Sequence, residues 1–137
     1  MWSFRVDPHL ALPASRQIVE AVLDGVASGR LAAGERLPSV RVMAAEALVN
    51  PNTVGKAYRE LEMEGITESR HGDGVFVTAA GPDRARALRR RATLESFRQA
   101  VLEGLRAGHA PDALSEVFES VLRGARSAGG VKKARGA

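Results

Sequence analysis

The sequence predicts a mainly α-helical protein with one small β-hairpin, which is an α+β fold. Three observations indicate this. Apolar residues recur at helical spacing over several segments, a glycine-bearing loop joins two β-prone runs, and the 137 residues include no cysteine for a disulfide framework. The first segment, residues 2–7, alternates apolar and polar residues, and it predicts a short strand that Asp7-Pro8 ends.

The first predicted helix runs from about Ala14 to Ser28. Its apolar residues fall on one face, and Gly29 stands where a helix C-cap glycine belongs. The residues of that face are Ile18, Ala21, Val22, Gly25 and Val26.

Two short helices follow, joined by a brief turn at Leu48-Val49. Ser39 is a suitable N-cap for a helix over residues 40 to about 47, with Val40, Met43, Ala44 and Ala47 inward. Asn50 can cap a second helix, which begins with Pro51 and ends near Gly65. The inward face of this second helix consists of Val54, Ala57, Tyr58 and Leu61. Two short helices joined in this way are typical of a helix-turn-helix.

A hairpin and two further helices complete the predicted elements. Residues 66–70 and 75–78 are β-prone runs around a loop that contains Gly72 and Gly74, and a hairpin directly after a helix-turn-helix is a wing. Gly81-Pro82 is expected to end this unit. Helices are then expected from about 83 to 107 and from about 112 to 126, where the second is strongly amphipathic.

The middle of the chain resembles the GntR family of bacterial transcriptional regulators. The matching blocks are Gln17-Ile18, GRLAAGERLPSVR at 29–41, NPNTVGKAYRELEMEG at 50–65 and SRHGDGVFV at 69–77. Each block has the family's order and spacing, and together they cover roughly residues 10–78. The short helical C-terminus resembles the YtrA-type branch, which lacks a large effector domain and dimerises through two helices. One departure is Leu48, which stands near a position where the family usually has a small turn residue.

The resemblance and the predicted elements together give three regions. Residues 1–81 are expected to form a winged helix-turn-helix DNA-binding domain, residues 82–126 a helical dimerisation region, and residues 127–137 a basic disordered tail. The expected partners are double-stranded operator DNA with a two-fold-symmetric site and a second copy of the chain. The branch resemblance suggests control of nearby transporter genes.

The second helix of the helix-turn-helix offers the candidate base contacts. With its apolar face buried, Asn50, Asn52, Thr53 and Lys56 remain to meet base edges in a major groove. The alternative for the last three is a solvated helix start, and Asn50 is expected to cap the helix in either case. Gly55 either lets DNA approach closely or is a tolerated surface glycine.

The remaining candidates would contact phosphates. Ser39 and Arg41 stand at a helix N-terminus that favours an anion, with capping and solvation as their alternative roles. Arg36 is a weaker phosphate candidate. In the wing, Arg70, His71 and Gly72 would lie along the phosphates or enter the minor groove, while a solvated loop is the alternative for His71.

Dimerisation is expected because the two C-terminal helices carry more apolar surface than a hairpin of two helices can cover. The alternative is that they fold back onto the winged domain of their own chain. The candidate interface residues are Leu94, Phe97, Val101, Leu105, Leu114, Val117, Phe118, Val121 and Leu122.

The net charge of +4 is unevenly distributed. Residues 1–81 contain 8 Lys and Arg against 10 Asp and Glu, a net charge of −2, whereas residues 82–137 contain 12 against 6, a net charge of +6. The basic excess lies in Arg84 to Arg91 and in Lys132, Lys133 and Arg135, where it either adds non-specific attraction for DNA or is simply solvated.

No motif indicates an enzyme, a metal site or a cofactor. The Gly72-Asp73-Gly74 segment is followed by a strand rather than by the helix that a phosphate-binding loop requires, and no histidine stands at metal-ligand spacing. No signal segment or membrane span is visible, so a cytoplasmic protein is expected. The predicted function is a dimeric transcriptional regulator, more naturally a repressor, with an effector that the sequence does not identify. The alternative is a winged-helix module that binds a protein instead of DNA.

Overall fold

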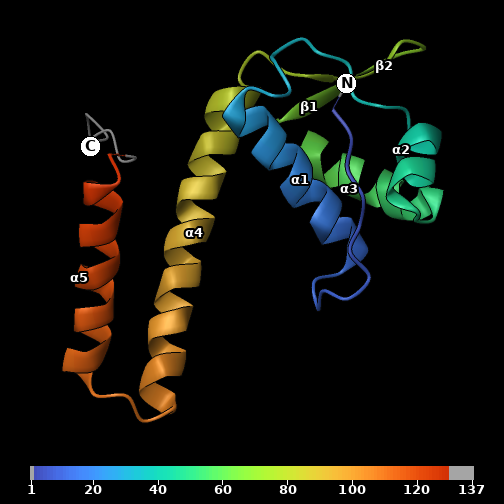
Figure 1. The fold of residues 1–137 in the computed structure, drawn as a ribbon. Helices are drawn as coiled ribbons and strands as arrows, with labels where there is room; N and C mark the ends of the chain where they lie inside the picture. The colour runs from blue at the N-terminus through green and yellow to red at the C-terminus, as the bar shows by residue number, and fades with distance from the viewer. Residues whose placement is uncertain (1, 130–137) are drawn as a thin grey trace. The chain divides into compact units, whose positions relative to one another are not determined.

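The computed structural model describes residues 2–129, and the chain divides into two compact units whose boundary falls between Ala92 and Thr93, within one helix. The elements in chain order are α1 (Ala14–Ser28), α2 (Val40–Ala47), α3 (Pro51–Met63), β1 (Thr67–Arg70), β2 (Gly74–Val77), α4 (Gly81–Arg106) and α5 (Pro111–Ser127) (Figure 1). The predicted mainly helical fold with a two-stranded wing is therefore confirmed. No helix in the described part of the chain is both long and apolar enough to cross a membrane.

Local signals place the ends of the first three helices. Gly29 ends α1 with a φ of 85°, a left-handed conformation that glycine adopts without steric cost. The Ser39 hydroxyl accepts a hydrogen bond from the Val42 N–H at 3.2 Å, and the Asn50 side chain accepts one from the Asn52 N–H at 2.8 Å. Both predicted N-caps are thus confirmed, and α1 and α2 have the predicted bounds.

The core of the first unit lies where α1, α2 and α3 converge. The predicted inward face of α3 is confirmed, since Val54, Ala57, Tyr58 and Leu61 are all at most 5% exposed. They pack with residues of the other elements, chiefly Ile18, Val22, Val26, Leu37, Met43, Ile66 and Val77. This packing leaves the opposite side of α3 exposed.

The wing is a hairpin with a third segment along its edge. In the antiparallel register, Glu68 lies opposite Phe76 and Arg70 opposite Gly74. On the other edge of β2, the Leu37 N–H donates to the Val75 carbonyl at 2.8 Å, and Arg36 bridges Phe76. The extended segment of residues 34–37 therefore joins the loop before α2 to the hairpin.

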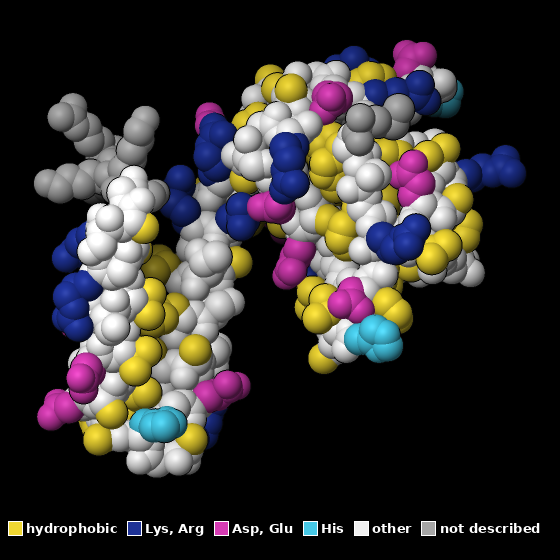
Figure 2. All heavy atoms as spheres, viewed as in Figure 1, with side chains coloured by type: hydrophobic (Ala, Val, Ile, Leu, Met, Phe, Trp, Pro, Cys, Tyr) yellow, Lys and Arg dark blue, Asp and Glu magenta, His cyan; other side chains and the backbone are white. Residues whose placement is uncertain are grey.

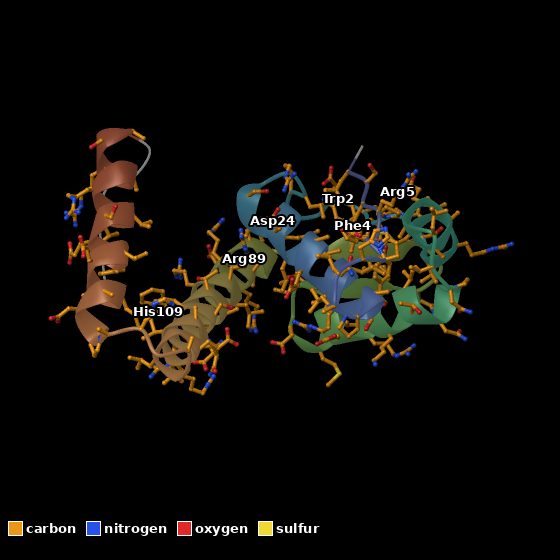
Figure 3. The ribbon with its side chains drawn as sticks, turned by 60° about the horizontal axis from the view of Figure 1, so that its bottom comes forward. Trp2, Phe4, Arg5, Asp24, Arg89 and His109 are labelled. Carbon is orange, nitrogen blue, oxygen red and sulfur yellow. The ribbon has the colours of Figure 1, made fainter. Side chains whose placement is uncertain are left out.

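Residues 2–7 are extended but form no strand, so that prediction is wrong. The alternation itself is real, because Trp2, Phe4 and Val6 are half-buried against the core and the residues between them are exposed. Figure 3 shows Trp2 and Phe4 against the helices of the first unit, to which they belong. A strand needs a neighbour to complete its hydrogen-bond ladder, and this segment has none among the described residues. Its backbone instead makes one weak bond from the Val6 N–H to the Ala47 carbonyl at 3.4 Å, and Asp7 bonds to the Gln17 side chain.

Gly81-Pro82 begins α4, whereas the sequence predicted that it ends the winged unit. Proline is tolerated in a first helical turn, because its missing N–H would have no partner there. The first turns of α4 belong to the core of the first unit: Ala85 is fully buried and Leu88 packs beside it. Arg89 forms an ion pair with Asp24 of α1 at 2.8 Å, and Figure 3 shows the two side chains close together.

The second unit consists of the rest of α4 and α5, which lie side by side with apolar side chains between them (Figures 1 and 2). The Phe97 and Phe118 rings lie 5.5 Å apart, and Leu114 fills the space above Gly104. Most of the predicted interface residues nevertheless stay exposed, from 43% at Phe118 to 71% at Leu94, and α5 has no buried residue. The expected basic tail lies largely outside the described residues, which end at Gly129.

Candidate nucleic-acid interface

The start of α3 presents a row of polar side chains on a firmly anchored helix. Asn52 and Lys56 are exposed and Thr53 is half-exposed, while the apolar side of the helix is buried in the core at Val54, Ala57, Tyr58 and Leu61. Asn50 uses its side-chain oxygen to cap the helix, so its amide nitrogen is the group that remains for other partners. The first turn contains no acidic residue, so the positive end of the helix is not neutralised by its own side chains.

Tyr58 holds α3 against the segment that leads into α2. Its hydroxyl donates a hydrogen bond to the Pro38 carbonyl at 2.7 Å. Burial raises the pKa of the Tyr58 phenol, and the negative charge of Glu46 raises it further, so the hydroxyl stays a neutral donor. The sequence placed Tyr58 in the core, but its hydrogen bond to a residue 20 positions earlier has no local signal. This contact fixes the start of α2 relative to α3.

Ser39 and Arg41 lie at the start of α2, as predicted. Both are exposed, and the Ser39 hydroxyl is engaged as the N-cap. The first turn of α2 also lacks an acidic residue. Two helix N-termini without an acidic residue in the first turn therefore belong to the same unit, one with Arg41 and the other with Lys56 close to it.

The wing carries the other predicted residues. Arg70 ends β1, and His71 and Gly72 are exposed in the turn, where Gly72 has a φ of 79°. Arg36 lies on the adjoining segment beside β2. Arg70 is engaged within the wing, because its guanidinium lies 4.2 Å from the centre of the Phe76 ring and 3.1 Å from a Glu68 carboxylate oxygen.

Charge is polarised along α3 although the domain as a whole is slightly acidic. Lys56 and Arg59 are the basic residues of the helix, and its acidic residues, Glu60 and Glu62, stand toward the C-terminal end. Glu60 is paired with Arg16 of α1, which removes part of that negative charge. Part of the basic run after residue 83 is also paired within the first unit, as Arg86 with Asp83 and Arg89 with Asp24.

Arg59 is a basic residue of this surface that the sequence reasoning missed. It is exposed, and its guanidinium reaches back over Gly55, where an added Cβ would lie 3.4 Å from Arg59 Nη1. The sequence could have indicated Arg59, because it stands four residues after Gly55 and so shares one face of the helix with it. Apart from that side chain and the neighbouring backbone of α3 itself, no atom of the described residues lies within 4 Å of the position that a Gly55 Cβ would take.

Comparison with known proteins points to one family. Residues 14–77 match the profile described as "Bacterial regulatory proteins, gntR family". The HTH-type transcriptional repressor YtrA of Bacillus subtilis is 40% identical over 74 residues, which span 54% of this chain and 57% of that relative, less than two thirds of its length.

Two solved structures extend the likeness to the fold. A transcriptional regulator from Oenococcus oeni superposes with a TM-score of 0.68 at 28% identity, over 85% of this chain and 97% of its own. YtrA from Sulfolobus acidocaldarius, described as a GntR-family transcription factor, superposes with a TM-score of 0.52 at 30% identity, over 66% of this chain and 96% of its own.

Proposed function

This chain belongs to the gntR family of bacterial regulatory proteins, and from that premise we propose that it is a dimeric, sequence-specific DNA-binding repressor. The family consists of DNA-binding transcriptional regulators and not of enzymes. The observation that carries the proposal is the solvent-accessible polar row of Asn52, Thr53 and Lys56, at the start of a helix whose first turn has no acidic residue and whose other face is buried. A single helix fits a major groove about 12 Å wide.

In this proposal α3 enters the major groove and the wing lies against the minor groove or the phosphate backbone. Asn52 is suited to adenine, whose N6 and N7 match an amide, and Lys56 to guanine or phosphate. Ser39 and Arg41 at the start of α2 are suited to a phosphate, as are Arg36, Arg70 and His71 on the wing. The roles of these side chains are thus divided between those that select a sequence and those that position the protein.

The second unit supports dimerisation. Leu94, Val117 and Val121 are each more than 60% exposed in the single chain, and α5, which has no buried residue, has its apolar face only partly covered by α4. A second copy can cover such a face symmetrically, and a symmetric pair reads two half-sites about one DNA turn apart. Repression is favoured by the likeness to the Bacillus relative, which is a transcriptional repressor.

Selection of bound fragments from genomic DNA, followed by footprinting of the best fragment, tests the proposal. We expect a two-fold-symmetric footprint, and increased transcription of the adjoining operon when the gene is deleted. If the chain retains no fragment specifically at moderate salt, DNA recognition is refuted and the protein-binding module is favoured.

Two substitutions test the division of roles. Arg41→Ala should weaken binding to all sequences alike, whereas Asn52→Ala should relax preference at one base position per half-site. Arg123→Ala on α5 removes the same charge outside the proposed surface, and it should change neither.

A further inference from the structure

The outward face of the wing brings together side chains from three segments. Thr67, Val77 and Leu37 are buried on the inner face, so alternation along each segment places their neighbours outward. The pairing of β1 with β2 and of Arg36 with Phe76 then assigns the outer face. Its members are Arg36, Glu68, Arg70, Gly74 and Phe76.

Arg70 is held in place by an aromatic ring and a carboxylate. Its guanidinium lies 4.2 Å from the centre of the Phe76 ring, close enough for a cation–π interaction, and 3.1 Å from the Glu68 carboxylate. Phe76 is diagonal to Arg70 across the hairpin, and Glu68 lies two residues before it on the same strand. The arginine is therefore preorganised, but one carboxylate occupies part of its hydrogen-bonding capacity.

Arg36 lies on the same face because Gly74 has no side chain. A Cβ built on Gly74 would lie 2.7 Å from Arg36 Nε and 3.2 Å from its Cζ. Gly74 has a φ of 117°, a conformation for which the hairpin already requires glycine. The missing side chain of this glycine also leaves space for the Arg36 guanidinium. Gly74 lies directly opposite Arg70 in the register, so Arg36 and Arg70 are the neighbours of Gly74 on its two sides.

We propose that Arg36 and Arg70 together form a binding site for one backbone phosphate of DNA, with Phe76 and Gly74 as positioning residues and Glu68 as an internal competitor. The inference rests on the proposed DNA-binding function and adds to it that the two arginines share a single phosphate. A guanidinium can form two parallel hydrogen bonds to phosphate, and two guanidiniums against one carboxylate leave the face with a net positive charge. A phosphate that approaches Arg70 displaces Glu68, whose exposed ion pair contributes little.

The test measures affinity for two duplexes of equal length, the footprinted site and a scrambled sequence, over a range of KCl concentrations. Arg36→Ala and Arg70→Ala should each weaken binding to both duplexes by about tenfold at low salt. The double variant, which loses the whole phosphate contact, should reduce the salt slope by about one. Because both arginines contact one phosphate, the double variant should lose less than the product of the single losses. Arg123→Ala is the charge-matched control and should bind like the wild type.

Glu68→Gln provides the sharper readout. It should tighten binding several-fold at low salt in the wild-type background and clearly less in the Arg70→Ala background, where Glu68 no longer competes with the phosphate for the Arg70 guanidinium. Thermal unfolding of each variant shows whether the wing stays folded. If the wild type binds the symmetric site and both arginine variants match Arg123→Ala, or if their losses multiply, the shared phosphate site is refuted while the proposed function stands. If the wild type binds neither duplex, both fail.

Discussion

Replacing Gly55 by alanine should stabilise the protein, because this glycine lies in the interior of α3 without a structural reason. Glycine in a helix costs about 0.5–1 kcal/mol relative to alanine, since its backbone loses more freedom on folding. Gly55 has no left-handed φ that would require glycine. The added methyl group would meet only the end of the flexible Arg59 side chain, at an ordinary contact distance of 3.4 Å. No steric cost therefore opposes the gain.

The magnitude follows from these two facts. Gly55→Ala should raise the free energy of unfolding by about 0.5–1 kcal/mol. For a unit of this size, that corresponds to an increase in Tm of roughly 2–8 °C. Chemical denaturation with an unchanged m-value, monitored by circular dichroism, measures the free energy directly.

Gly81→Ala is the matched control with the opposite expected sign. Gly81 is also in a helix, but a Cβ there would lie 2.8 Å from the Ile66 carbonyl oxygen and 3.0 Å from a Val77 methyl group. The backbone carbonyl cannot move cheaply, so this variant should lose about 1–3 kcal/mol. If Gly55→Ala is neutral or destabilising, or if both variants shift stability alike, the reasoning from local space is refuted.

The same variant separates the two interpretations of Gly55. If DNA approaches the helix closely at this position, the methyl group should weaken binding to the footprinted duplex although the protein is more stable. If Gly55 is a tolerated surface glycine, affinity should stay unchanged. Opposite effects on stability and binding would identify a position kept open for the ligand.

Three further predictions concern other elements. Leu48 is 73% exposed and has a left-handed φ of 59°, which is unfavourable for a residue with a Cβ. Leu48→Gly should therefore raise the free energy of unfolding by about 0.5 kcal/mol, whereas Leu48→Ala, which keeps the Cβ, should not. Equal effects of the two variants in denaturant titrations would contradict this. Tyr58→Phe removes the bond to Pro38 and should cost about 1 kcal/mol at neutral pH. Burial raises the pKa of Tyr58, so its contribution to the free energy of unfolding is fully present below the unfolded pKa of about 10 and is lost as pH rises further. Wild-type stability should therefore fall more steeply than that of Tyr58→Phe in alkaline denaturation, and parallel curves would argue against this. Val121 is 65% exposed, so Val121→Glu should leave the fold intact and raise the dimer dissociation constant about a hundredfold by sedimentation, and an unchanged constant would place the interface elsewhere.

The helices of the DNA-binding region could be predicted from the sequence because their determinants are local. Ser39 and Asn50 cap the helices that immediately follow them, and Gly29 ends the helix immediately before it. Apolar spacing likewise identified the buried face of α3, and with it the exposed polar row. These features depend on residues within a few positions of one another, so no knowledge of the rest of the fold was needed.

Predictions that depended on a distant partner were less reliable. The alternation in residues 2–7 correctly places Trp2, Phe4 and Val6 inward, but whether an extended segment becomes a strand depends on a neighbouring edge, and none pairs with it. Gly81-Pro82 has the composition of a boundary between two domains. In the structure it forms the first turn of α4, where Gly81 lies close to Ile66 and the helix packs on the core.

The sequence by itself determined the order of the elements, the caps and faces of the helices, and the family to which the chain belongs. Tertiary structure alone decided what those elements bring together: the Tyr58 hydroxyl on the Pro38 carbonyl, Arg36 beside Gly74, and Arg70 over Phe76. The physical reason is that caps and periodicity arise from hydrogen bonds and burial within one or two turns. The contacts that shape a binding surface join residues many positions apart, and only the packing of the core fixes their distance.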